Sequence, residues 1–313
     1  MAHIVLGIAC AHELPLDIPT NELETGGRAG IDDGTPLWFR GERVEFDELL
    51  AERQSEEEPP EITSLDANLQ RAKDALRQLR DEFARAEPDI AIIFGTDHDE
   101  MFHEDIKPAI TFMGCDSFSI PNGSNFDTCP GHPVLASYLA KAAQKSDFDI
   151  SYSRRQRVSG PNRSMSHAYS FVCSQLVGDA GTAIVPIDIN TYYPPNQPQA
   201  SRCFSLGRLV GKAVRGWDDD ARIAVIASGG LSHPAIDEEF DRDIIKAMES
   251  GDFKYLQSYH EGHYQEGSSQ IKTWLSMGGA IQGSYLKGHT VDYCPLYRTE
   301  AGTGDSAAFM IWQ

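Results

Sequence analysis

The sequence lacks the features that mark membrane proteins, secreted proteins and zinc-finger domains. It has no run of about 18 apolar residues, so we expect no segment to cross a bilayer. Its start, MAHIVLGIACAHELP, has no basic stretch followed by a long apolar run. Its six cysteines form neither a CxxC pair nor a dense framework. We therefore expect a cytoplasmic protein whose cysteines are reduced.

Positive charge is also scarce. The 313 residues include 47 acidic and 27 basic side chains, which gives a formal net charge of −20 at pH 7. Contacts with phosphate require clustered Lys and Arg, so this balance disfavours nucleic acid and anionic membranes as partners. A small-molecule substrate fits better. The hydrophobic share of 41% is ordinary for a globular protein and supplies material for a core.

Short apolar runs alternate with segments of helical periodicity along the chain. Runs typical of buried strands occupy His3–Ala9, Ile90–Phe94, Ala183–Ile189 and Ile223–Ala227, and GTGDSAAFMIW is expected to be a last strand. Apolar residues at three- and four-residue spacing predict helices over Ser64–Ala86, His132–Gln144, His167–Leu176, Asp237–Met248, Asp252–Tyr259 and Ser268–Met277. This order predicts a single α/β domain over residues 1–313, with a central mixed sheet flanked by helices and a site at the carboxyl ends of strands.

One stretch interrupts the alternation. Residues 15–60, from about Pro15 to Pro60, are rich in Gly, Pro and acids, with GGRAGIDDGTP followed by AERQSEEEPPE. We interpret them as a long surface excursion within the single catalytic domain. A lid and a subunit contact remain alternative roles for it.

Four of the ten histidines follow predicted strands or begin a predicted helix. His12, His98 and His233 follow three strands, and His167 begins a helix. Imidazole is a common ligand of iron, zinc and copper, and it transfers protons near neutral pH. A lone histidine is more often a surface or core residue, so the joint pattern carries the prediction. Five others are interpreted as structural or exposed: His103, His132, His260, His263 and His289.

Two histidines and one carboxylate from different elements can hold Fe(II) and leave one face open for substrate and oxygen. His12 and His98 would supply the two imidazoles. His167 and His233 then remain for acid–base work.

Six segments, in order, resemble the landmarks of the class III extradiol dioxygenases, of the type of protocatechuate 4,5-dioxygenase β subunit and gallate dioxygenase: ACAHELP, GTDHDEMF, SHAYSFV, INTYYPPNQPQASRCFSLG, ASGGLSHP and QIKTWL. The resemblance covers nearly the whole chain except the acidic excursion. It implies a non-haem Fe(II)-dependent enzyme that cleaves the aromatic ring of a catechol-type substrate, protocatechuate, gallate or a related hydroxylated aromatic, with O2. It also implies a homo-oligomer, with or without a small helical partner subunit.

The resemblance implies a role for each histidine. His12 and His98 match the two histidine ligands of iron, and His233 matches the histidine that acts as general base and acid. His167 matches a pocket histidine that contacts substrate or oxygen. The family's carboxylate ligand is a Glu four positions before a Trp, and Gln270 occupies that position here.

Gln270 leaves several hypotheses open, because a neutral amide oxygen binds iron more weakly than a carboxylate. Gln270 still binds iron, or a nearby acid replaces it, with Glu266 one turn away and Asp97, Asp99 and Glu13 beside the other ligands. Otherwise the chain is a non-catalytic relative or partner subunit, or one in which the glutamine was introduced to trap a complex. A zinc-dependent hydrolase or lyase with the same histidines is a further alternative. Retention of all four histidines favours activity.

Three other features are less specific. Tyr192–Pro195 is either a rigid loop or part of the pocket lining. Gly229 and Gly230 are expected to form the turn that presents His233. Arg163 and Arg202 are weaker candidates for binding a substrate carboxylate.

Overall fold

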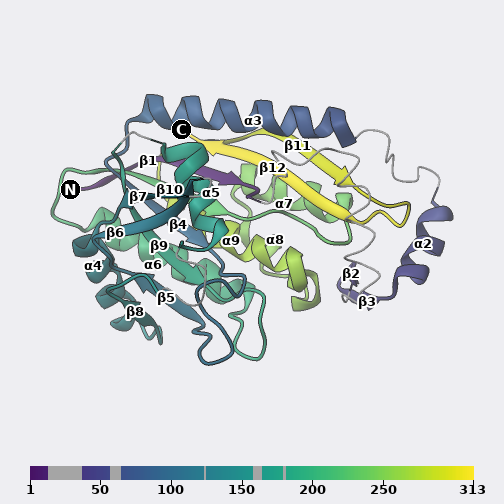
Figure 1. Ribbon diagram of the computed structural model, residues 1–313, viewed down its shortest axis with the longest axis horizontal. Coiled ribbons are helices and arrows are strands. Elements are labelled where there is room, and N and C mark those ends of the chain that lie inside the picture. The colour runs from purple at the N-terminus through teal and green to yellow at the C-terminus, as the bar shows by residue number, and fades with distance from the viewer. Residues whose placement is uncertain (13–36, 57–64, 123–124, 158–163, 179–180) are drawn as a thin grey trace.

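A computed structural model of the chain describes residues 1–12, 37–56, 65–122, 125–157, 164–178 and 181–313. An eight-stranded mixed sheet in the order β11-β12-β1-β10-β4-β9-β5-β8 forms its centre (Figure 1). The strands are β1 (His3–Cys10), β4 (Ile90–Gly95), β5 (Ile110–Met113), β8 (Ser151–Ser153), β9 (Ala183–Ile189), β10 (Arg222–Ser228), β11 (Gly288–Tyr297) and β12 (Gly304–Trp312). The predicted α/β class and central mixed sheet are confirmed.

Four parallel strands form the middle of the sheet. β1 pairs with β10, β10 with β4 and β4 with β9, all in parallel. Antiparallel partners flank them, with β12 beside β1 and β5 beside β9. These four strands are the four apolar runs predicted from the sequence. Because they run in the same direction, their carboxyl ends meet at one edge of the sheet.

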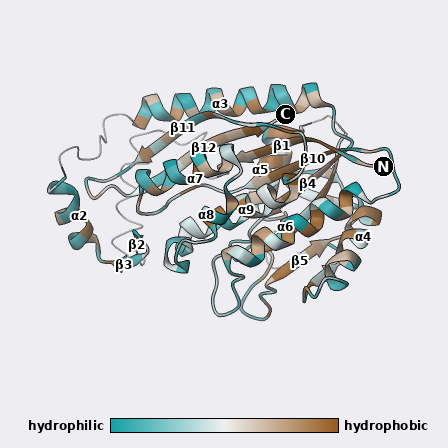
Figure 2. Cartoon of the chain, turned by 180° about the vertical axis from the view of Figure 1, so that it is seen from behind, coloured by the Kyte–Doolittle hydropathy of each residue, from teal (hydrophilic) through white to brown (hydrophobic). Residues whose placement is uncertain are grey.

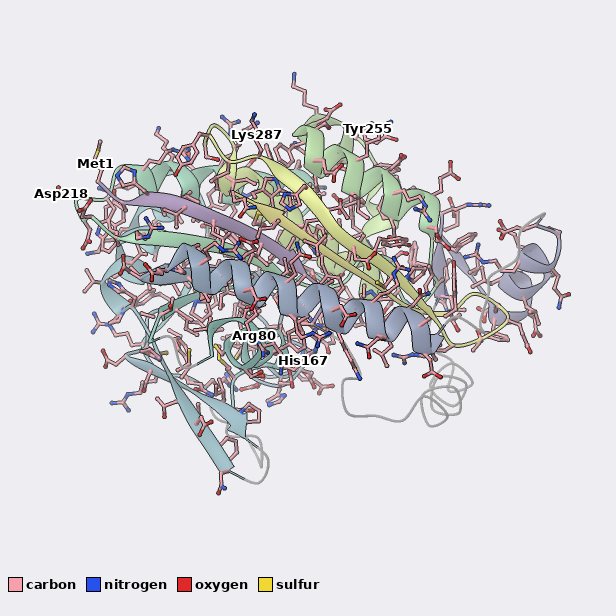
Figure 3. The ribbon with its side chains drawn as sticks, turned by 90° about the horizontal axis from the view of Figure 1, so that it is seen from above. Met1, Arg80, His167, Asp218, Tyr255 and Lys287 are labelled. Atoms are coloured by element: carbon pink, nitrogen blue, oxygen red, sulfur yellow. The ribbon has the colours of Figure 1, made fainter. Side chains whose placement is uncertain are left out.

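Helices cover both faces of the sheet. On β4, Ile90, Ile92 and Phe94 point to one face, and Ala91 and Ile93 point to the other, as the period of two requires. The first face is covered by α4 (Pro133–Gln144), α6 (Ala200–Arg215), α7 (Glu238–Ser250), α8 (Phe253–Leu256) and α9 (Ile271–Ile281). The second face is covered by α3 (Leu65–Ala86), α5 (His167–Val172) and the π-helical turn η2 (Cys173–Val177). Figure 2 shows the apolar strands between these layers, and Figure 3 looks onto α3.

Most of the predicted helices are confirmed. α3 buries the apolar stripe that predicted it, including Leu69, Leu76 and Phe83. His132 is the N-cap of α4, where its Nδ1 accepts a hydrogen bond from the backbone N–H of Leu135. α6 was not predicted, because two glycines interrupt its apolar stripe. Among the described helices, none combines the length and apolar character needed to cross a membrane. All six cysteines are buried and free.

The acidic excursion contains regular structure that its composition did not predict. Residues 37–56 form β2 (Leu37–Phe39), β3 (Glu42–Val44) and α2 (Phe46–Gln54), which project from one end of the molecule (Figure 1). Leu37, Phe39 and Leu49 form a small core of their own with Ala235 and Ala301. The remainder of the excursion lies outside the described residues. The other short elements are β6 (Ser117–Asn122), β7 (Asn125–Pro130), η3 (Glu261–Tyr264) and η4 (Glu266–Gln270).

α6 and α9 cross at very short range, and this contact yields a stability prediction. A Cβ on Gly207 would lie 1.8 Å from the carbonyl oxygen of Ser276, which is backbone and cannot move aside. We expect Gly207→Ala to lower the free energy of unfolding by about 1–3 kcal/mol through overpacking. Gly216→Ala is the matched control, because its Cβ would meet nothing closer than 3.6 Å. Equal urea midpoints for the two variants would contradict the prediction.

Candidate functional site

Each of the four predicted histidines is delivered to the carboxyl edge of the parallel strands. His12 follows β1, His98 follows β4, and His233 lies in the loop after β10. His167 is the first residue of α5, which packs against β4 and β10. The convergence predicted from the strand ends is therefore observed.

Three of these histidines form a compact group. The ligand atoms of His12, His98 and His167 all lie within 4.8 Å of one another. The ring of His167 is centred 4.9 Å from that of His12 and 4.8 Å from that of His98, and the His12 and His98 rings are 5.9 Å apart. His12 is buried, and the other two are partly exposed.

Hydrogen bonds fix the tautomers of two of the three rings. Ser228 Oγ donates to the carbonyl oxygen of Ala168 at 2.6 Å, so it accepts from Nδ1 of His12 at 2.9 Å. Nδ1 of His167 is 2.9 Å from Oε2 of Glu100, and a carboxylate can only accept. Both rings therefore carry their hydrogen on Nδ1 and a lone pair on Nε2. This is the arrangement in which a protein orients a histidine toward a metal.

Glu100 was missed in the sequence, although it stands two residues after His98. Its Oε2 also accepts from the backbone N–H of His167 at 3.0 Å. Burial raises the pKa of Glu100, but the hydrogen bonds from His167 and Ser166 outweigh it and lower that pKa to about 2. Glu100 is thus an anion that holds His167 in place.

Gln270 is fully buried and has a defined amide orientation. Its Oε1 accepts from the backbone N–H of Gly230 at 2.7 Å, and its Nε2 lies 3.2 Å from Nε2 of His98. An amide nitrogen is a donor and offers no ligand atom. Trp274, one turn along α9, donates to the carbonyl oxygen of Gly229 at 2.9 Å and secures the same loop. Gln270 therefore presents its amide nitrogen, not its oxygen, to the histidine group.

His233 lies outside the group of three but is linked to it through Gln270 and Gly230. Its Nδ1 donates to the carbonyl oxygen of Leu231 at 2.8 Å, which leaves the lone pair on Nε2. Its ring packs on Gly267, where a Cβ would lie 2.0 Å from Cδ2 of His233. A glycine is required there, because any side chain would displace the ring.

None of the acids proposed to replace the missing carboxylate ligand joins the histidine group within the described residues. Asp97 accepts from the backbone N–H groups of Met101 and Phe102, both at 2.9 Å, and so closes its own turn. Asp99 forms an ion pair with Lys107. Glu266 begins η4 with a positive φ of 46°. Glu13 lies outside the described residues.

The tyrosine loop reaches the group on one side. The Tyr192 ring is centred 5.9 Å from that of His98 and 4.9 Å from that of Tyr193. This contact supports pocket lining over a purely rigid loop for Tyr192. Arg202 instead donates to the carbonyl oxygen of Asp147 on the exposed side of α6, and Arg163 lies outside the described residues.

The loop that carries His233 is anchored by a buried carboxylate. Asp241 accepts from the backbone N–H and the hydroxyl of Ser232 and from the hydroxyl of Tyr293, each at 2.8 Å. Burial raises the pKa of Asp241 to about 6, although the hydrogen bonds of Ser306, Ser232 and Tyr293 act in the opposite direction. The folded protein therefore holds this proton more tightly than the unfolded chain does.

This raised pKa gives a pH dependence with a definite sign. Between about pH 4 and pH 6 the folded state binds more protons at Asp241 than the unfolded state, so stability falls as pH rises through that window. We expect the free energy of unfolding of the natural chain, minus that of Asp241→Asn, to fall by about 2 kcal/mol from pH 4.5 to pH 7.5. Denaturant titrations of both proteins measure it, and parallel pH profiles would contradict it.

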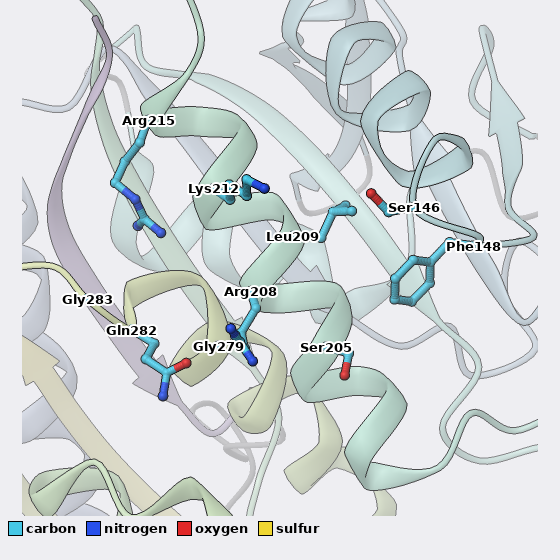
Figure 4. A pocket seen from close by; sticks show the side chains of 10 residues that line it. All are labelled: Ser146, Phe148, Ser205, Arg208, Leu209, Lys212, Arg215, Gly279, Gln282 and Gly283. Atoms are coloured by element: carbon cyan, nitrogen blue, oxygen red, sulfur yellow. The ribbon is translucent and has the colours of Figure 1, made fainter.

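A separate surface pocket of about 540 Å³ lies over α6 and the end of α9 (Figure 4). Arg208, Lys212 and Arg215 line it together with Phe148 and Gln282. None of its lining side chains is a histidine or a carboxylate, so it offers no metal ligand of the kinds found at the strand edge. The chemistry points to the histidine group instead.

The donor set of that group fits a divalent transition metal. Imidazole nitrogen suits iron, zinc and copper. An ion held at about 2.1 Å can bridge nitrogens up to ~4.2 Å apart. The ligand atoms lie within 4.8 Å of one another, so the most distant of them must move closer when an ion binds.

Comparison with known proteins identifies the family of the chain. The family described as the catalytic LigB subunit of aromatic ring-opening dioxygenase matches residues 57–309. A 2,3-dihydroxyphenylpropionate/2,3-dihydroxicinnamic acid 1,2-dioxygenase from Rhodococcus sp. is 31% identical, over 80% of this chain and 94% of that one. Gallate dioxygenase from Pseudomonas putida is 25% identical over 53% of this chain, and the match spans 50% of that protein.

The chain thus spans about half the length of several of the curated relatives it matches. Among solved structures, an uncharacterized protein from Escherichia coli K12 aligns with a TM-score of 0.48 and 13% identity, over 75% of this chain and 91% of that chain. The family match covers β4, α5 and β10, which position His98, His167 and His233. On the evidence of its sequence, this chain belongs to the family of the catalytic LigB subunit of aromatic ring-opening dioxygenases.

Proposed function

We propose that the chain is a non-haem Fe(II)-dependent extradiol dioxygenase that opens the ring of a catechol-type substrate with O2. The observation that carries this proposal is the group of His12, His98 and His167 at the carboxyl edge of the strands. His233 follows a strand at the same edge, and its Nε2 holds a lone pair. Family membership supports the reaction class. The names of the relatives, a gallate and a dihydroxyphenylpropionate dioxygenase, favour a catechol that bears a carboxylate.

The residues of the chain divide the work. His12 and His98 would hold the iron, which would supply a binding site for the catechol and a path for electrons to O2. His233 removes a phenolic proton through Nε2 and returns it as the ring opens beside the hydroxyl-bearing carbons. Leu231 keeps His233 in the required tautomer. Tyr192 borders the pocket next to His98.

Two other candidate functions have specific support. The amide donor that Gln270 presents to His98 favours a non-catalytic relative, a trapped form or a partner subunit. Three histidines are also the ligand set of some zinc enzymes, which favours a zinc-dependent hydrolase or lyase. A cytoplasmic location, a homo-oligomer and a small helical partner subunit are proposals from the family alone.

Oxygen consumption tests the proposed function. Anaerobically purified protein is loaded with Fe(II) or Zn(II) and mixed with protocatechuate, gallate or 2,3-dihydroxyphenylpropionate in an oxygen electrode. We expect the iron form alone to consume one O2 per ring and to yield a coloured ring-opened product. Resorcinol is the matched control, because its hydroxyls are not adjacent and cannot chelate. Iron-loaded protein that consumes no oxygen with any of these catechols would overturn the proposal.

A further inference from the structure

The residue in the position of the carboxylate ligand is not arranged to bind a metal. Both polar atoms of the Gln270 amide have partners: Oε1 accepts from Gly230 at 2.7 Å, and Nε2 faces Nε2 of His98. Turning the oxygen toward His98 would break the bond to Gly230 and bury an unpaired backbone N–H, which costs about 1–3 kcal/mol. In the metal-free chain the glutamine therefore links His98 to the loop of His233, and a metal ion bound at that nitrogen of His98 would replace the amide contact.

His167 has the features that Gln270 lacks. The centre of its ring lies 4.9 Å from that of His12 and 4.8 Å from that of His98. These distances are shorter than the 5.9 Å between the His12 and His98 rings. Glu100 accepts the hydrogen of Nδ1 at 2.9 Å and the backbone N–H of the same residue at 3.0 Å, so both the ring and its backbone are fixed. The nitrogen left with a lone pair is Nε2, as a metal ligand requires.

We infer that this chain binds its metal ion through three histidines, His12, His98 and His167, with Glu100 orienting His167 and Gln270 taking no part as a ligand. The inference refines the metal site of the proposed function and rests on it only for the identity of the metal. His167, expected from the resemblance to contact substrate or oxygen, becomes a ligand instead.

The arrangement moves a carboxyl group from the metal to the outer nitrogen of a histidine ligand. In a two-histidine-one-carboxylate site the anion binds the metal directly. Here Glu100 lies one imidazole away from the same position, at the outer nitrogen of His167. A carboxylate in that position raises the basicity of a histidine ligand. The chain thus keeps one carboxylate at the site while all three ligand atoms are neutral nitrogens.

Cobalt binding tests the inference without oxygen or catechol. Co(II) is titrated anaerobically into the natural chain, His167→Ala, Glu100→Gln and Gln270→Ala, and Kd is obtained by competition with a chelator. We expect His167→Ala to weaken binding more than ~100-fold and Glu100→Gln to weaken it ~10–100-fold. Gln270→Ala should stay within about threefold. His289→Ala, which alters an exposed histidine on β11, is the matched control and should bind normally.

Each outcome decides the question. Tight binding by His167→Ala with loss in Gln270→Ala would overturn the inference and leave the proposed dioxygenase standing. Normal binding by Glu100→Gln would also overturn it, and this variant decides the matter if His167→Ala does not fold. Absence of cobalt binding by the natural chain would overturn it as well. The expected cobalt pattern without oxygen uptake by the iron form would support the three-histidine site and refute the proposed function. Electron spin echo measurements on the Cu(II) form should detect three coordinated imidazoles in the natural chain and two in His167→Ala.

Discussion

His233→Gln is expected to lose kcat by 10²- to 10⁴-fold while it keeps its metal, because general acid–base groups contribute on that scale. The variant removes the lone pair on Nε2 that would accept the phenolic proton. The deficit should shrink as the assay pH rises, since a catechol already ionised in solution has less need of a base. Steady-state kinetics from pH 6 to pH 9, with iron content measured on the same samples, test both statements.

A second variant separates position from chemistry. Gly267→Ala keeps His233 but places a Cβ 2.0 Å from its Cδ2, so the ring must move. We expect kcat of this variant to fall as well. Its deficit should not shrink as the assay pH rises, unlike that of His233→Gln, because the base is still present. His289→Gln is the control, because that side chain is exposed on β11. Full activity of His233→Gln at pH 7 would remove this histidine from the mechanism.

The parallel core and most of its helices could be predicted because local pattern and burial agree there. β4, β9 and β10 read as short apolar runs since both of their faces are covered by helices. β11 mixes polar and apolar residues and is partly exposed along most of its length. For this reason it was not predicted as a strand. α6 was missed because Gly207 and Gly211 weaken its helical signal, and their purpose is visible only once α9 is packed against them.

The sequence predicted which histidines form the candidate site, but it did not predict which side chains orient them. Strand ends indicated His12, His98 and His233, because the topology of parallel strands brings such ends together. The identity of the third ligand depends on where Glu100 and the Gln270 amide point. These orientations are set by hydrogen bonds from Gly230 and His167, which no spacing in the sequence encodes.

Gln270→Glu is expected to tighten Fe(II) binding by about 100-fold or more. One carboxylate oxygen can keep the bond from Gly230, and the other then replaces the amide nitrogen next to His98. A unit charge about 4 Å from another is worth about 4 kcal/mol at an effective dielectric constant of 20, so an added anion far outweighs a neutral amide. The same buried carboxylate should destabilise the metal-free protein by several kcal/mol, because its charge is desolvated.

Thermal melting with and without Fe(II), together with chelator competition, measures both effects. Gln282→Glu is the matched control, because it adds the same charge at an exposed position at the other end of α9. The double variant His167→Ala/Gln270→Glu is the sharpest form of the test. A new carboxylate ligand should restore the metal that His167→Ala loses, since it rebuilds a site of two histidines and one acid. If the double variant binds iron no better than His167→Ala, a carboxylate at position 270 does not reach the metal. The expected gain in iron binding from Gln270→Glu would then be wrong.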